Sequence, residues 1–190
     1  EVEIFTRKDA SEKNLRNVDL YDYKVLYFAT HGLLPGELKC QAEPGLVLTP
    51  PKKADSRNDD GLLEASEIAT LRLNADLVVL SACNTAGSGG KFGGDALSGL
   101  AEAFFYAGAR NLVVSHWQVP SKATAVLMSK MFEELGTELE LGASLAMRKA
   151  QNALISDKTT SHPFFWAAFV VVGDGIADSW LPIPRGEKLA

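Results

Sequence analysis

A histidine and a cysteine each follow a short run of apolar residues, and this pair could carry out nucleophilic chemistry. His31 comes after the run at residues 25–29, and Cys83 closes the run at residues 77–82. A free cysteine thiol is mostly protonated near neutral pH, so it needs a neighbouring base such as an imidazole to become a strong nucleophile. The two residue types therefore predict that Cys83 is a nucleophile and that His31 is its base.

The two apolar runs have the pattern of neighbouring strands in a parallel sheet. Residues 77–82 carry no charged side chain and lie between Asp76 and a glycine-rich segment at residues 87–94, as expected of a strand buried on both faces. In open sheets of this kind, chemistry takes place just beyond the carboxyl ends of the strands. Two such neighbours that end level would bring His31 and Cys83 into one cleft.

Strands and helices alternate along the rest of the chain. Apolar strands are predicted at residues 111–115 and 166–172, and helices at residues 95–108, 122–135 and 141–154. This alternation is typical of an α/β fold in which helices cover both faces of a mainly parallel central sheet. We therefore expect a three-layer α/β/α sandwich.

Length and composition indicate one soluble globular domain. The chain has 190 residues, of which 46% are hydrophobic and 23% charged, and these proportions are ordinary for a soluble protein. A net charge of −5 argues against direct binding to nucleic acid, and no apolar run reaches the roughly 20 residues of a membrane span. With two cysteines and no signal peptide, the chain is expected to function in the reducing cytoplasm.

Neither a metal nor a cofactor is expected from the remaining motifs. The three aspartates within residues 55–60 could hold a cation, but their spacing does not fit a calcium-binding loop, and a solvated turn is favoured. The segment at residues 87–94 resembles a phosphate-binding loop, yet Thr85 and Phe92 stand where that loop needs glycine and Ser or Thr. Nucleotide binding is therefore disfavoured.

Four blocks of sequence occur in the order found in one known family. They are residues 27–32, residues 77–85, residues 107–110 leading to Trp117, and residues 162–169. Together these blocks resemble the CHAT domain, a bacterial branch of the caspase-like cysteine peptidases related to separase. Caspases likewise place their histidine about 50 residues before the cysteine. The resemblance extends over residues 1–175 and leaves residues 176–190 as a C-terminal tail.

The resemblance implies a fold, an activity and a mode of control. The fold is the caspase-like sandwich, and the activity is that of a cysteine endopeptidase that cleaves a protein partner through a His31–Cys83 dyad. Members of the family often follow tetratricopeptide repeats, so an upstream repeat region or a regulatory partner is expected to control the activity. A chain that begins at Glu1 rather than Met agrees with an origin in a longer protein.

Cys83 is the better nucleophile of the two cysteines. Cys40 has no histidine near it in sequence and lies in an irregular segment rich in proline and glycine. A structural role as a small buried hydrophobe is the alternative for Cys83. If Cys83 attacks a carbonyl, the backbone N–H groups of Gly32 and of Cys83 itself are the natural oxyanion donors, because glycine allows close approach of the backbone.

A specificity pocket is expected in the loop after residues 111–115. The family commonly reads Leu-Trp-x-Val-x-Asp there, and separases use an acid at this point to receive a basic side chain. Here Trp117 is expected to form an apolar floor, and Gln118 and Ser121 are expected to provide polar contacts, while Asp95 could supply a carboxylate from the other side of the cleft. An uncharged pocket disfavours arginine or lysine, so a neutral side chain is expected at the cleaved position.

The other two histidines have less direct predicted roles. His116 follows the strand at residues 111–115 and is expected either to form a wall of the cleft or to be a polar residue with its hydrogen bonds satisfied. His162 precedes Pro163 and is expected to order that corner of the chain by hydrogen bonding.

Two alternative functions remain open from the sequence. A catalytically silent CHAT scaffold would bind a protein without cleaving it, although a scaffold of that kind usually lacks one residue of the dyad. A flavodoxin-like nucleotide-binding module would place a ligand at residues 87–94 and leave the thiol unactivated.

Overall fold

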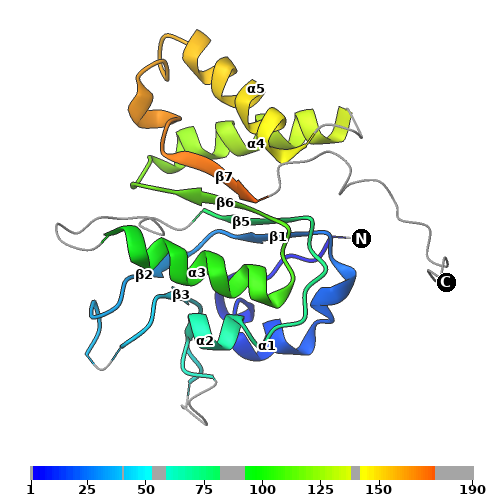
Figure 1. The fold of residues 1–190 in the computed structure, drawn as a ribbon, viewed down its shortest axis with the longest axis vertical. Coiled ribbons are helices and arrows are strands. Elements are labelled where there is room, and N and C mark those ends of the chain that lie inside the picture. The colour runs from blue at the N-terminus through cyan, green and yellow to red at the C-terminus, as the bar shows by residue number, and fades with distance from the viewer. Residues whose placement is uncertain (1, 40, 53–58, 82–92, 138–141, 174–190) are drawn as a thin grey trace.

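Within the residues that the computed structural model describes, two sheets of different size organise the chain (Figure 1); these residues are 2–39, 41–52, 59–81, 93–137 and 142–173. The larger sheet has the strand order β1 (Val25–Phe28), β5 (Leu77–Leu80), β6 (Asn111–Ser115) and β7 (Phe169–Gly173). Strands β1, β5 and β6 run parallel, and β7 runs antiparallel to β6. The expected mainly parallel sheet is therefore confirmed.

Strand β5 shows why its sequence is apolar without a break. Leu77 and Val79 pack into one core cluster, whereas Val78 and Leu80 pack into another, and all four residues are fully buried. Successive side chains of a strand point to opposite faces. Each face of the sheet is covered at β5, so every position along the strand must be apolar.

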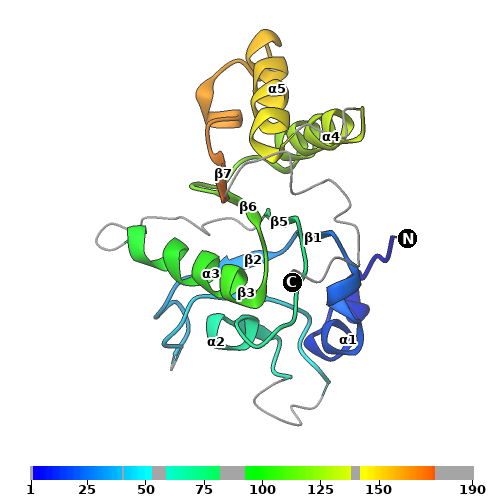
Figure 2. The same cartoon turned by 45° about the vertical axis from the view of Figure 1, so that its right-hand side comes forward.

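Helices lie on both sides of the larger sheet (Figures 1 and 2). One side carries α1 (Glu12–Asn17), α2 (Ala65–Ile68) and α3 (Gly93–Ala107), and the other carries α4 (Ser121–Thr137) and α5 (Ala143–Ser156). The helices predicted at residues 95–108, 122–135 and 141–154 correspond to α3, α4 and α5, and are confirmed. Short 3₁₀ helices occur at Arg7–Asp9, Leu20–Asp22 and Pro163–Phe165. In the described parts of the chain, no helix has both the length and the apolar character to cross a membrane.

The carboxyl ends of β1 and β5 are level, as predicted. Phe28 pairs with Leu80, and the Ser81 N–H donates a hydrogen bond to the Phe28 carbonyl at 3.0 Å. His31 follows Phe28 by the same number of residues as Cys83 follows Leu80. The described chain therefore leaves the two neighbouring strands at the same level, before His31 on one side and at Ser81 on the other.

The smaller sheet adds a feature that the apolar run at residues 25–29 does not predict. It contains β2 (His31–Leu33), β3 (Gly45–Val47) and β4 (Leu62–Glu64), and these strands pair antiparallel in the order β2-β3-β4. The sequence pattern predicts His31 just beyond the end of a strand of the larger sheet, and it does follow β1 directly; in addition, His31 is the first residue of β2. The reason is a partner distant in sequence, because β2 pairs with β3 immediately after β1 ends.

Candidate active site

A cleft of about 310 Å³ lies at the carboxyl ends of the parallel strands, where the sequence predicts the active site. Tyr27, Thr30 and His31 border it from the chain around the end of β1, and Ser81 borders it from the end of β5. His31 belongs to the smaller sheet, whereas Ser81 continues a strand of the larger sheet. The cleft therefore lies where the two sheets meet.

His31 enters this cleft from an anchored backbone. Its side chain is exposed, and its backbone is paired with Val47 of β3. Immediately before it, the Thr30 hydroxyl donates a hydrogen bond to the Val47 carbonyl. An accessible imidazole on a fixed backbone is suited to accept and return protons.

The other half of the predicted dyad lies outside the described residues. Cys83 is in this group, together with Cys40, the glycine-rich segment before α3 and the predicted tail at residues 176–190. The distance from the Cys83 sulfur to the His31 imidazole therefore stays a prediction. Gly32, the other predicted oxyanion donor, is buried and paired with Leu46.

The loop after β6 forms another wall of the cleft. Trp117, Val119 and Ser121 line it, so two of the predicted pocket residues are among its described lining. Gln118 is exposed and does not belong to that lining. Asp95 falls in the first turn of α3, where the backbone is described and the side chain is not.

His162 orders its corner of the chain as predicted. Its Nδ1 accepts a hydrogen bond from the Phe164 N–H at 3.1 Å and caps the 3₁₀ helix Pro163–Phe165. The Phe164 carbonyl in turn accepts a hydrogen bond from the Trp117 indole N–H at 3.0 Å. His162 therefore supports Trp117, and with it a wall of the cleft, through Phe164. His116 is exposed and is not part of the described lining of the cleft.

Several lining residues had no predicted role in the site, although Tyr27 and Phe169 belong to the sequence blocks at residues 27–32 and 162–169. Tyr27 of β1, Phe169 of β7 and Thr124 of α4 complete the cleft. The Tyr27 ring lies 6.2 Å from that of Phe132 on α4. In the structure, Tyr27 is the exposed residue between two buried neighbours in β1. The α4 residues reach the cleft only through tertiary packing.

The described lining of the cleft has little charge. None of its residues is acidic, and its polar groups other than His31 and Tyr27 are the hydroxyls of serines and threonines and the indole N–H. Within the described ranges, no cluster of three or more His, Cys, Asp or Glu side chains could hold a metal ion. The described part of the site can therefore offer a base, hydroxyl contacts and aromatic surface.

Comparison with known proteins connects the chain with one family. The family model described as CHAT domain matches residues 1–174. Among curated proteins, tetratricopeptide repeat protein 28 is 36% identical over 115 residues in Mus musculus and 34% identical over 115 residues in Homo sapiens. Each match covers 60% of this chain but only 4% of the relative, so the chain is similar to a small part of that protein.

Proposed function

The chain belongs to the CHAT domain family, and on this premise we propose that it is a cysteine endopeptidase that cleaves a protein partner. His31 is the proposed base and Cys83 the proposed nucleophile, within a caspase-like α/β/α sandwich. The observation that carries the proposal is the level pairing of Phe28 with Leu80, because the segments that lead to His31 and Cys83 leave the sheet side by side.

The proposed reaction is acyl transfer through a thioester. His31 accepts the proton of the Cys83 thiol, and the sulfur forms a bond to the carbonyl carbon of the scissile peptide. The negative charge on the carbonyl oxygen is bound by the N–H groups of Gly32 and Cys83. The C–N bond then breaks as His31 gives the proton to the leaving amine. Water attacks the thioester with His31 again as base, which releases the acid and restores the thiol.

We propose further that the cleft accepts a neutral side chain at the cleaved position. The described lining carries aromatic surface from Tyr27, Trp117 and Phe169 and no carboxylate. A guanidinium or ammonium group moved from water into such a site would lose hydration without gaining a partner. Asp95 is the residue whose carboxylate could change this preference.

Control by another part of a longer protein is the third element of the proposal. The two relatives reported above are named for tetratricopeptide repeats, and the CHAT family resemblance implies such repeats upstream. We propose that a repeat region or a regulatory partner governs when the cleft acts on its protein substrate.

A proteome-derived peptide library tests the peptidase proposal. Wild-type chain should generate new peptide termini, and Cys83→Ala or His31→Ala should reduce their formation by at least about 10³-fold. Cys40→Ala is the matched thiol control and should cleave like the wild type.

Thiol labelling provides a second measurement that needs no substrate. Iodoacetamide at neutral pH should modify Cys83 faster than Cys40, because only Cys83 has the proposed imidazole partner. His31→Ala should remove this difference. Equal labelling of the two cysteines, together with no cleavage of the library, would favour the catalytically silent scaffold.

A further inference from the structure

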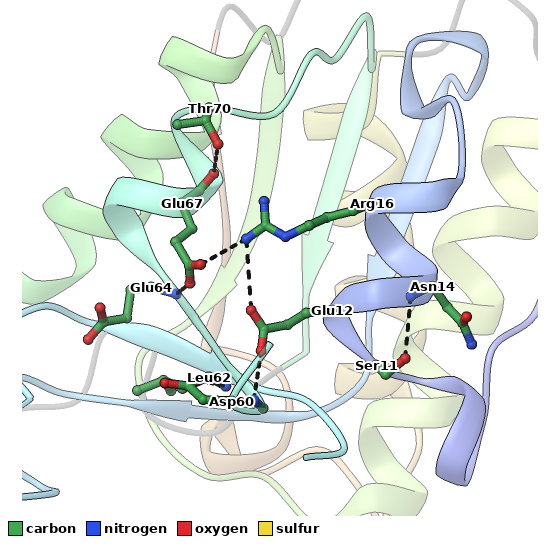
Figure 3. Close-up of polar contacts among 10 residues, drawn as sticks. Ser11, Glu12, Asn14, Arg16, Asp60, Leu62, Glu64, Glu67 and Thr70 are labelled. Atoms are coloured by element: carbon green, nitrogen blue, oxygen red, sulfur yellow. Dashed lines mark hydrogen bonds and ion pairs between the residues drawn. The ribbon is translucent and has the colours of Figure 1, made fainter. Parts of the chain in front are cut away.

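One carboxylate outside the cleft is buried and holds the backbone of the smaller sheet. Glu12, the first residue of α1, is 0% exposed, and its Oε2 accepts a hydrogen bond of 2.6 Å from the Gly61 N–H. Among the described residues its Oε1 has no hydrogen-bond partner, and it lies 3.8 Å from the Arg16 guanidinium (Figure 3). A buried carboxylate is unfavourable unless it is well paired, so the position of Glu12 requires an explanation.

The surroundings of Glu12 make its negative charge costly. Burial raises the pKa of Glu12 and outweighs the hydrogen bond from Gly61, and the carboxylates of Glu67 and Asp60 raise the pKa further. Arg16 is shared, because it also bonds to Glu67 of α2 at 2.8 Å (Figure 3). If Glu12 only filled space, an apolar residue of the same size would often serve as well. Its role therefore lies in the backbone group that it binds.

That backbone group, the N–H of Gly61, belongs to a tightly constrained residue. Gly61 has a φ of 92°, and a Cβ at this position would lie 2.8 Å from Pro50. Only glycine fits such a conformation without strain. The Gly61 carbonyl accepts a hydrogen bond from the Leu48 N–H at 2.8 Å, so Gly61 also joins the chain after β3 to the chain before β4.

From Gly61 a single row of paired residues leads to His31. Leu62 follows Gly61 and pairs with Val47 of β3, and Val47 pairs with His31 of β2. The Thr30 hydroxyl, next to His31, bonds to the Val47 carbonyl. A shift of Gly61 would therefore pass through two neighbouring strands to the backbone of His31.

We propose that Glu12 is a positioning residue, which holds Gly61 and thereby keeps β2 and the His31 imidazole in place at the cleft. This inference rests on the proposed role of His31 as the catalytic base. It gives the buried carboxylate a function that an apolar side chain could not perform, because the Gly61 N–H would be left without its acceptor.

The segment that contains Glu12 makes further contacts with the same sheet. Thr49, which follows β3, donates its N–H to the Ala10 carbonyl at 2.8 Å and its hydroxyl to the Arg7 carbonyl at 2.6 Å. A partner that drew residues 7–17 away from the smaller sheet would break these bonds together with the one to Gly61. The segment is thus a route by which the activity of His31 could be controlled.

Two replacements at Glu12 separate hydrogen bonding from space filling. Glu12→Gln keeps an oxygen that can accept from Gly61, whereas Glu12→Met has a similar length and no such acceptor. A ¹H–¹³C NMR spectrum of the imidazole Cε1 groups reports on each of the 3 histidines. We expect Glu12→Met to shift or broaden the His31 signal and to leave those of His116 and His162 unchanged, while Glu12→Gln stays close to the wild type.

Two further variants make the test decisive. Leu154→Ala removes a side chain that is 1% exposed, in the core cluster on the other side of the larger sheet, so it should lower stability without moving the His31 signal. Thr49→Val removes one hydroxyl bond to the same N-terminal segment and should shift the His31 signal by less than Glu12→Met. It keeps the test available if Glu12→Met does not fold.

Kinetics add a readout that a purely structural role would not produce. Glu12→Met should lower kcat for a cleaved peptide roughly ten- to hundredfold with little change in KM, because a small misplacement of a catalytic group has effects of this size. An unchanged His31 signal in folded Glu12→Met would overturn the inference, and so would an unchanged signal in Thr49→Val if Glu12→Met does not fold. The NMR measurement needs no substrate, so an absence of cleavage by the wild type would count against the proposed function alone.

Discussion

The two sheets of this molecule are held together by different means. The larger sheet depends on apolar burial, since all four residues of β5 are fully buried between two core clusters. The smaller sheet also has buried leucines, Leu46 and Leu63, but its strands contain only 3 residues each. Its position depends in addition on polar contacts, from Glu12 to Gly61 and from Thr49 to the N-terminal segment.

This difference suggests how reactivity at the cleft could be controlled. A hydrogen bond contributes a net of about 0.5–1.5 kcal/mol and is lost when its geometry changes, whereas apolar burial is larger and non-directional. The strand that leads to Cys83 is therefore hard to displace, and the strand that carries His31 is easier to displace. We expect control of the proposed activity to act on the base rather than on the thiol.

The largest expected effect follows from truncation in the larger sheet. Leu80 is 0% exposed, and Leu80→Ala should lower the free energy of unfolding by about 2–5 kcal/mol, because a cavity remains in the core. Urea denaturation measures this change. Tyr106→Ala is the control, since Tyr106 is 82% exposed and its truncation should have little effect. A loss at Leu80 no larger than that at Tyr106 would contradict the importance of apolar burial.

The second prediction compares two buried carboxylates, one beside each sheet. Asp76 precedes β5 and forms an ion pair with Arg110, whereas Glu12 accepts its hydrogen bond from a backbone N–H. Asp76→Asn should lower the free energy of unfolding by about 1–2 kcal/mol, since Arg110 loses its charged partner and is itself partly exposed. Glu12→Gln should cost less, because its acceptor oxygen is kept. Denaturation at neutral pH measures the free energy of unfolding of both variants. A greater loss for Glu12→Gln than for Asp76→Asn would contradict the prediction.

A third, smaller effect concerns the wall that the larger sheet and α4 provide. Ser121→Asp places an acid in the described lining of the cleft and should raise kcat/KM for arginine over neutral residues roughly two- to fivefold. Ser144→Asp, an exposed position on α5, is the matched control. A strong wild-type preference for arginine would point instead to Asp95.

The smallest expected effect is a difference in how pH acts on the two regions. Beside the smaller sheet, burial raises the pKa of Glu12 above 4.5, and burial together with Glu43 raises the pKa of Glu64. At the end of α5, hydrogen bonds from Thr159 lower the pKa of Asp157 below 3.8. The carboxyl groups in the two regions therefore respond to pH in opposite directions.

The sign of each contribution follows from proton linkage. With a raised pKa, the folded state binds the proton more tightly, so the stability that Glu12 contributes is present below pH 4.5 and is lost as pH rises through the raised value. The contribution of Asp157 is present above pH 3.8 and is lost as pH falls through the lowered value. Glu12→Gln should flatten the first dependence and Asp157→Asn the second, as measured by unfolding at a series of pH values. If the stability of Glu12→Gln varies with pH as that of the wild type does, Glu12 does not contribute to the pH dependence.

Local patterns were enough to predict the larger sheet and its helices. The unbroken apolar runs at residues 77–82 and 111–115 correspond to β5 and β6 because strands covered on both faces have no position for a polar side chain. Of the smaller sheet, the sequence pattern indicates only a short hairpin strand at residues 46–48, which corresponds to β3. Three residues are too short to show a periodicity, and β2 and β4 pair with β3 across long stretches of intervening chain.

Residue types are enough to say which chemistry is available, whereas long-range packing sets where the reacting groups lie. A histidine after one apolar run and a cysteine after another specify a base and a nucleophile, because side-chain chemistry is a property of the residue type. The attachment of His31 to the smaller sheet, and through Val47 and Gly61 to Glu12, depends on pairings between residues far apart in the chain. Such pairings form only when both partners are brought together by the packing of the whole domain.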